Sequence, residues 1–233
     1  MQDVVERALR KLNWQGKSLL AAGRTDTGVH ATGQVIAFDL EWNHPLEELQ
    51  EALNATLPQD VVARQVKPVP ANFHPRRDAI SRTYFYHIFF EEIRNPLRER
   101  YAWRVWPEAD PQRLRQSAQE LVGQHDFSAF GSPPRAGSST VRKVSQADWH
   151  PEANGDGWIF LVQAEAFLYH MVRRMVSLQV EIAQGKYVSC TLQEYLQPQN
   201  RVECEPPVTV QGLAPPNGLV LVEVGYPPWK ILT

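Results

Sequence analysis

The sequence predicts an α+β protein in which a mostly antiparallel sheet is covered by helices on one face. Segments with alternating apolar residues, such as 81–88, are typical of strands. Segments with apolar residues at helical spacing, such as 2–12, are typical of helices. Both kinds of segment occur in each half of the chain, and two such halves predict a cleft between them.

Length and composition are those of an ordinary globular protein. The 233 residues are 43% hydrophobic and include seven tryptophans, enough for a sizeable core in one large domain or two modest ones. No segment resembles a signal peptide, and no apolar run approaches the length of a membrane span. Cys190 and Cys204 are too few and too far apart for a zinc site, and a reduced pair fits better than a disulfide. We therefore expect a cytoplasmic protein without a metal, a cofactor or a membrane partner.

The helices are predicted from apolar spacing and from their first residues. Pro45 lies in the first turn of the second helix, and Asp110 is the expected N-cap of the third, with Pro111 at its first position. The fourth helix keeps its apolar residues at helical spacing from Leu168 to Val180. The predicted helices cover residues 2–12, 45–53, 110–122 and 167–184.

The strands are predicted from alternation and from turn residues between apolar runs. A Gly-rich turn joins 141–149 to 158–166 as a hairpin, and the apolar runs 19–22 and 35–38 flank another turn. The other predicted strands cover residues 61–69 and 81–88.

The turn between residues 23 and 35 reads GRTDTGVHATGQV and presents one carboxylate, Asp26, close to one guanidinium, Arg24. Three glycines indicate a backbone that bends tightly or that another molecule approaches closely. A rigid turn that displays a single aspartate is a natural platform for a functional side chain. The alternative is that Asp26 only hydrogen-bonds the backbone of its own turn.

Positive charge gathers in the middle of the chain although the net charge is −2. Between Arg64 and Arg115 there are eleven lysines and arginines against six acids. This excess fits a face that binds phosphates, and a solvated surface of mixed sign is the alternative.

The turn resembles the catalytic loop of the TruA-type tRNA pseudouridine synthases, whose pattern is GRTDAGVHAxGQV; within its first eight residues only Thr27 departs from that pattern. Further segments resemble this family in the same order, and together they extend the likeness over nearly the whole chain. They are FHPRRDA at 73–79, SRTYFYHI at 81–88, GQHDFSAF at 123–130, FLYHMVRR at 167–174 and APPNGLVL at 214–221, the last as a closing strand over 213–221.

The resemblance implies two ferredoxin-like or RRM-like halves with a central RNA-binding cleft. Residues 1–100 would form the half with the catalytic loop, and residues 101–233 would complete the cleft. The family has a further strand and a YDGxxYxGWQ loop ahead of the first helix, and this chain is expected to lack both.

The resemblance also implies the catalytic residues. Asp26 would be the nucleophilic carboxylate, which must be ionised and held in place to act. Arg173 would orient it, ideally as a bidentate pair. Tyr84 takes the position of the tyrosine that contacts the target uracil, although its strand pattern alone fits a core residue equally well.

Basic residues would bind the RNA. The resemblance places Arg76 and Arg82 along the RNA backbone, and Arg24, next to Asp26, would take part in base flipping or contact a phosphate.

The implied function is isomerisation of uridine to pseudouridine at positions 38 to 40 of the tRNA anticodon stem–loop, by a homodimer. A catalytically inactive RNA-binding or chaperone module of the same fold is the main alternative. A structural protein in which Asp26 and Arg173 form an ordinary buried ion pair is a third.

Overall fold

The computed structural model describes residues 1–153, 155, 157–186, 192–196 and 209–228. The chain divides into two compact units, each assembled from separate stretches of sequence. The larger unit comprises Thr25–Gly33 and Ser81–Val224, and the smaller unit comprises Met1–Arg24, Gln34–Ile80 and Gly225–Thr233. The domain boundary expected at residue 100 stays a prediction.

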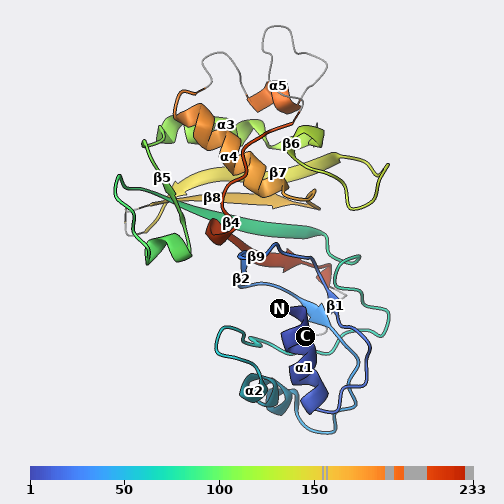
Figure 1. Ribbon diagram of the computed structural model, residues 1–233. Coiled ribbons are helices and arrows are strands. Elements are labelled where there is room, and N and C mark those ends of the chain that lie inside the picture. The colour runs from blue at the N-terminus through green and yellow to red at the C-terminus, as the bar shows by residue number, and fades with distance from the viewer. Residues whose placement is uncertain (154, 156, 187–191, 197–208, 229–233) are drawn as a thin grey trace. The chain divides into compact units, whose positions relative to one another are not determined.

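The larger unit is built on a mixed sheet whose described strands have the order β2-β9-β4-β8-β7-β6, with β5 beside β4 (Figure 1). Neighbours in the run β4-β8-β7-β6 are antiparallel, whereas β2–β9 and β4–β5 are parallel. The predicted α+β class with a mostly antiparallel sheet is therefore confirmed. The strands are β2 (His30–Ala31), β4 (Ser81–Phe90), β5 (Trp103–Val105), β6 (Gly123–Asp126), β7 (Val141–Pro151), β8 (Gly157–Ala164) and β9 (Leu219–Gly225).

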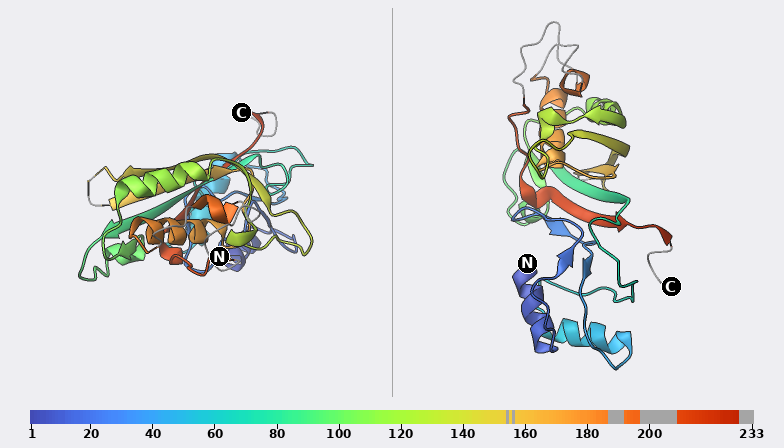
Figure 2. Two further views of the ribbon diagram at one scale, coloured as in Figure 1. Left: turned by 90° about the horizontal axis from the view of Figure 1, so that it is seen from above. Right: turned by 90° about the vertical axis from the view of Figure 1, so that its right-hand side faces the viewer.

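Two helices of this unit, α3 (Pro111–Glu120) and α4 (Met171–Ala183), lie side by side on one face of the sheet (Figure 2). Asp110 caps α3 as predicted, because its carboxylate accepts a hydrogen bond of 2.8 Å from the Gln112 amide. The apolar face of α4 packs on the sheet and forms one core with it. A short helix, α5 (Leu192–Leu196), adds its buried side chains to that core.

The smaller unit contains α1 (Gln2–Lys11), α2 (Leu46–Thr56) and a two-stranded antiparallel sheet of β1 (Leu20–Ala21) and β3 (Ile36–Ala37). Its core is separate from that of the larger unit and consists of Leu9, Trp14, Leu19, Leu49 and Leu53. The helices predicted at 2–12 and 45–53 are confirmed, and the second extends three residues further. Among the described residues, no helix has the length and apolar character that crossing a membrane requires.

The strand predicted at 61–69 is wrong, because side chains of α2 take the place of a neighbouring strand. The Ala63 amide donates to Asn54 Oδ1 at 2.7 Å, and the Ala63 carbonyl accepts from Asn54 Nδ2 at 3.0 Å. The Arg64 carbonyl accepts from Gln50 Nε2 at 3.0 Å. The backbone in this segment is therefore satisfied without a sheet partner.

Two further elements begin later than predicted. The fourth helix starts at Met171, because His170 has a left-handed backbone with φ of 64° and Tyr169 bonds to Ser132 instead of to a helical turn. The closing strand starts at Leu219, because Pro216–Gly218 forms a 3₁₀ turn. Asn154 and Asp156 of the 141–166 hairpin turn, together with Cys190 and Cys204, lie outside the described residues.

The predicted strands on either side of the Gly-rich turn are present as β1 and β3. The turn itself contains one short strand, β2, that was not predicted. The Thr32 and Gly33 amides both donate to the Leu221 carbonyl, at 2.9 and 3.1 Å, which fixes the end of β2 against β9. A Cβ on Gly33 would lie only 2.0 Å from the Val222 carbonyl oxygen. Glycine at this position therefore allows the two backbones to approach.

Gly33→Ala is expected to destabilise the protein by about 1–3 kcal/mol or more, because the added methyl group overlaps the β9 backbone. Gly23→Ala is the matched control, since a Cβ there meets nothing within 4 Å. Thermal unfolding of both variants measures the difference. Equal melting temperatures would contradict the close approach of this segment to β9.

Candidate functional site

Asp26 lies in the turn that leads into β2, and the turn is closed by backbone rather than by its side chain. The Val29 amide donates to the Asp26 carbonyl at 3.1 Å. Gly28 has φ of 86°, a backbone conformation that residues other than glycine rarely adopt. The carboxylate is thus available for other partners, and the alternative in which it only bonds its own turn is not what the structure shows.

Arg173, in the first turn of α4, is the first partner of Asp26. Its Nη1 donates to Asp26 Oδ2 at 2.7 Å, although 147 residues separate the two in sequence. Its Nε donates to the Ala214 carbonyl at 2.7 Å. The pair is therefore not the bidentate one expected, because the backbone of Ala214 occupies the second edge of the guanidinium. That additional bond fixes the direction in which Arg173 points.

His170 is the second partner, and the sequence analysis did not identify it. Its Nε2 lies 3.1 Å from Asp26 Oδ2, the same oxygen that Arg173 contacts. Within the described part of the chain, Asp26 Oδ1 accepts no hydrogen bond from the protein. Helical spacing could not have found His170, because this residue precedes α4 and has a left-handed backbone. The carboxylate is held by one oxygen and open at the other.

Burial sets the charge of the two titratable groups next to Asp26. It lowers the pKa of His170, and the charges of Arg173 and Arg174 lower it further, whereas Asp26 opposes the shift. Burial also raises the pKa of Tyr84, with Asp26 adding to the rise and Arg82 opposing it. At neutral pH both side chains are consequently uncharged.

Tyr84 lies on β4, with its ring edge-on to Phe167 at a centroid distance of 5.2 Å. It is partly buried against the main core and yet close enough to Asp26 to be affected by its charge. Tyr86, two residues further along the strand, is fully buried and donates to the Pro215 carbonyl at 2.8 Å. Tyr86 is thus a core residue, whereas Tyr84 packs partly on the core and is affected by the charge of Asp26.

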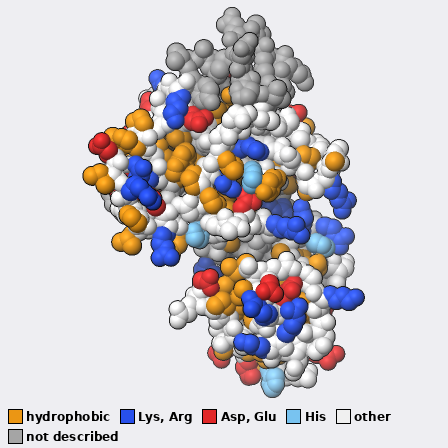
Figure 3. Space-filling model, in the orientation of Figure 1, with side chains coloured by type: hydrophobic (Ala, Val, Ile, Leu, Met, Phe, Trp, Pro, Cys, Tyr) orange, Lys and Arg blue, Asp and Glu red, His pale blue; other side chains and the backbone are white. Residues whose placement is uncertain are grey.

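The three predicted RNA-binding arginines have different surroundings. Arg82, on β4, donates from Nη1 to the Glu165 carbonyl at 2.8 Å, which places it in the same unit as Asp26. Arg24 and Arg76 are exposed residues of the smaller unit. On the face of the larger unit turned to the viewer in Figure 3, basic, histidine and hydrophobic side chains meet around acidic atoms.

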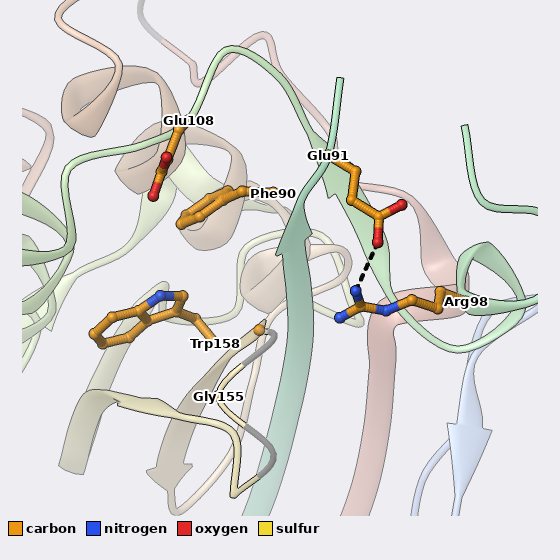
Figure 4. A pocket seen from close by; sticks show the side chains of 7 residues that line it. Phe90, Glu91, Arg98, Glu108, Gly155 and Trp158 are labelled. Carbon is orange, nitrogen blue, oxygen red and sulfur yellow. Dashed lines mark hydrogen bonds and ion pairs between the residues drawn. The ribbon is translucent and has the colours of Figure 1, made fainter. Parts of the chain in front are cut away.

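A cavity of about 450 Å³ elsewhere in the larger unit is not this site. Figure 4 shows that it is lined by Phe90, Trp158 and Glu108 and by the 2.8 Å ion pair of Arg98 with Glu91. Neither Asp26 nor its partners line it. The described residues contain no group of three or more histidines, cysteines, aspartates or glutamates that could hold a metal ion. The arrangement around Asp26 is instead suited to chemistry by a carboxylate.

The chain is similar to known proteins over almost its whole length. The profile of a family described as tRNA pseudouridine synthase matches residues 1–78 and 117–227. Proteins named tRNA pseudouridine synthase A from Paraburkholderia phymatum, Burkholderia thailandensis and Burkholderia mallei are each 37% identical to it over 227 residues. These alignments cover 97% of this chain and 81–82% of the relatives. Asp26 and Arg173 fall within the ranges that the family profile matches.

The lowered pKa of His170 predicts a pH dependence of stability. The unfolded chain takes up the proton near the ordinary histidine value of 6.5, at higher pH than the folded protein. The contribution of neutral His170 is therefore complete above about pH 6.5 and decreases as the pH falls below it. We expect His170→Gln, which keeps a donor but does not titrate, to lose less thermal stability than the unmodified protein between about pH 7.5 and about pH 5.5.

His44→Gln provides the control for this measurement, because the His44 side chain is 63% exposed. Its melting curves over the same pH range measure what the replacement of an exposed histidine contributes. Parallel melting curves for His170→Gln and the unmodified protein across this range would contradict the prediction.

Proposed function

The chain belongs to the tRNA pseudouridine synthase family and isomerises uridine to pseudouridine in tRNA, and we propose that Asp26 is the catalytic carboxylate of this reaction. The observation on which the proposal rests is the asymmetric environment of Asp26. Arg173 and His170 both contact Oδ2, at 2.7 and 3.1 Å, whereas Oδ1 accepts no hydrogen bond from the residues that the structure describes. An open oxygen on an oriented carboxylate is what attack on a ribose or a base, or removal of a proton, requires.

In the proposed mechanism Arg173 keeps the carboxylate oriented while the glycosidic bond breaks, the uracil turns and a carbon–carbon bond forms. The guanidinium is suited to this role because the Ala214 carbonyl restrains it independently of Asp26. Its side chain is only 11% exposed, so water competes little for the pair. The proposed reaction needs no cofactor and no metal.

Tyr84 is proposed to stack on the target uracil after the nucleotide leaves its base stack. Extrusion costs a few kcal/mol, and stacking on one aromatic ring returns about 1–3 kcal/mol. The edge-on contact with Phe167 supports this role, because it restrains the orientation of the tyrosine ring. The raised pKa of Tyr84 keeps the phenol uncharged near the RNA phosphates.

We further propose the finer features that the family resemblance implies. The target uridines would be those at positions 38 to 40 of the anticodon stem–loop, and Arg24, Arg76 and Arg82 would contact the RNA backbone. The enzyme would act as a cytoplasmic homodimer. Its two halves, 1–100 and 101–233, would be ferredoxin-like and would enclose the RNA between them.

Asp26→Asn is expected to abolish isomerisation and to leave the affinity for tRNA nearly unchanged, because the amide keeps the shape but is not a nucleophile. The measurement is tritium release from tRNA labelled at uracil C5, since the isomerisation must expel that hydrogen. Asp110→Asn is the control, because asparagine caps a helix as well as aspartate. An active Asp26→Asn variant would exclude Asp26 as the catalytic residue, and no release from the unmodified chain would favour a binding module.

Arg173→Met is expected to lower activity strongly and to reduce the free energy of unfolding by about 1–3 kcal/mol, because it leaves Asp26 and the Ala214 carbonyl without their donor. Arg113→Met removes an exposed arginine that forms a 3.6 Å ion pair, and it should cost less than about 1 kcal/mol. Tritium release and chemical denaturation test both variants. A stable, fully active Arg173→Met protein would show that the pair has no part in the mechanism.

A further inference from the structure

Tyr169 is an aromatic residue with a large exposed surface immediately beside the Asp26 site. It is 60% exposed, in contrast to its neighbours Leu168 and Met171, which are buried in the core. Its ring stacks on His170 with a centroid distance of 3.7 Å and an interplanar angle of 27°. The imidazole covers one face of the tyrosine, and the high exposure indicates that solvent reaches much of the remainder. Core packing does not require an aromatic ring here.

The backbone that presents this ring is fixed. The Tyr169 amide donates to the Ser132 carbonyl at 3.0 Å, and the following residue, His170, adopts the left-handed conformation that starts α4. A Cβ on Gly131 would lie 2.3 Å from the Tyr169 carbonyl oxygen, so the two segments approach as closely as glycine permits. An exposed side chain on a fixed backbone loses little backbone freedom when it binds a ligand.

His170 connects the tyrosine to the candidate catalytic carboxylate. The same imidazole that stacks on Tyr169 places its Nε2 3.1 Å from Asp26 Oδ2. A flat ligand on the outer face of Tyr169 would therefore be separated from Asp26 by little more than two stacked rings. Arg174 is close enough to His170 to lower its pKa, which adds positive charge next to the stack. A flat group joined to phosphates fits these surroundings.

We propose that Tyr169 is a stacking platform for a nucleobase of the RNA next to the uridine that is modified. The inference rests on the proposed function, because it takes Asp26 as the point to which the target uridine is brought. Tyr84 would receive the extruded uracil. Tyr169 would stack on a base that borders the gap left by extrusion. The platform binds a base without reading its identity, since every base has a π-face. Its loss therefore weakens RNA binding and leaves the chemical step intact.

The test measures binding of an anticodon stem–loop RNA in the Asp26→Asn background, where no turnover occurs. In two separate probes, 2-aminopurine replaces the nucleotide on the 5′ or the 3′ side of the target uridine. Tyr169→Ala is expected to raise the Kd about 5- to 100-fold, the range that one stacked base contributes, and to abolish the fluorescence quenching of one probe. Tyr169→Trp, which keeps a stacking face, is expected to bind within about twofold of the parent.

Tyr101→Ala is the matched control. Tyr101 belongs to the same unit, is 63% exposed and lies 5.1 Å from the ring of His30, but at a tilt of 44°. Its loss should leave the Kd and the quenching unchanged. All three substitutions should keep the melting temperature of the parent, because both tyrosine side chains lie largely outside the core.

A kinetic measurement in the active protein separates this inference from the proposed function. Tyr169→Ala should raise KM for tritium release and change kcat less than about threefold. An unchanged Kd with both probes still quenched would overturn the platform, even if loss of tritium release in Asp26→Asn upholds Asp26. An equal loss of affinity in Tyr101→Ala would also overturn it. Loss of kcat with unchanged KM would assign Tyr169 to the support of His170 instead.

Discussion

The contact between Asp26 and Arg173 is the interaction on which the arrangement of the larger unit's functional face depends. It joins a turn near the start of the chain to a helix 147 residues later. Arg173 in turn bonds to the Ala214 carbonyl, and the Ala214 amide donates to the Arg173 carbonyl at 3.3 Å. Three distant segments therefore meet at one guanidinium. A monodentate pair is sufficient for orientation here because the other edge of the guanidinium is already restrained.

The sheet of the larger unit restrains both Asp26 and Arg173. β9 follows Ala214 by a few residues and pairs in parallel with β2, the strand that ends the Asp26 turn. The close approach at Gly33 and the paired amides at Leu221 hold the turn against β9. The segment that restrains Arg173 and the strand that restrains Asp26 are thus continuous with each other. The geometry of the carboxylate follows from the sheet rather than from the turn alone.

Local signals were sufficient for much of the fold and for part of the site. Asp110 followed by Pro111 predicted the start of α3 correctly, because capping depends on adjacent residues. The strand at 61–69 failed because Asn54 and Gln50, on α2, satisfy its backbone, and alternation contains no information about such a partner. The sequence prediction of the site missed His170 for a related reason. Apolar spacing extended α4 back over this residue, and only its left-handed backbone brings the imidazole to Asp26.

The two neighbours of Asp26 Oδ2, Arg173 and His170, differ in charge at neutral pH. Arg173 contributes the positive charge of a guanidinium, which balances the carboxylate. A second full positive charge at Oδ2 would leave the cluster of Asp26, Arg173 and His170 with a net positive charge. Burial lowers the pKa of His170, so the imidazole whose Nε2 lies 3.1 Å from Asp26 Oδ2 stays neutral at neutral pH. The residue ahead of α4 thus gives Asp26 a second neighbour at Oδ2 without a second positive charge.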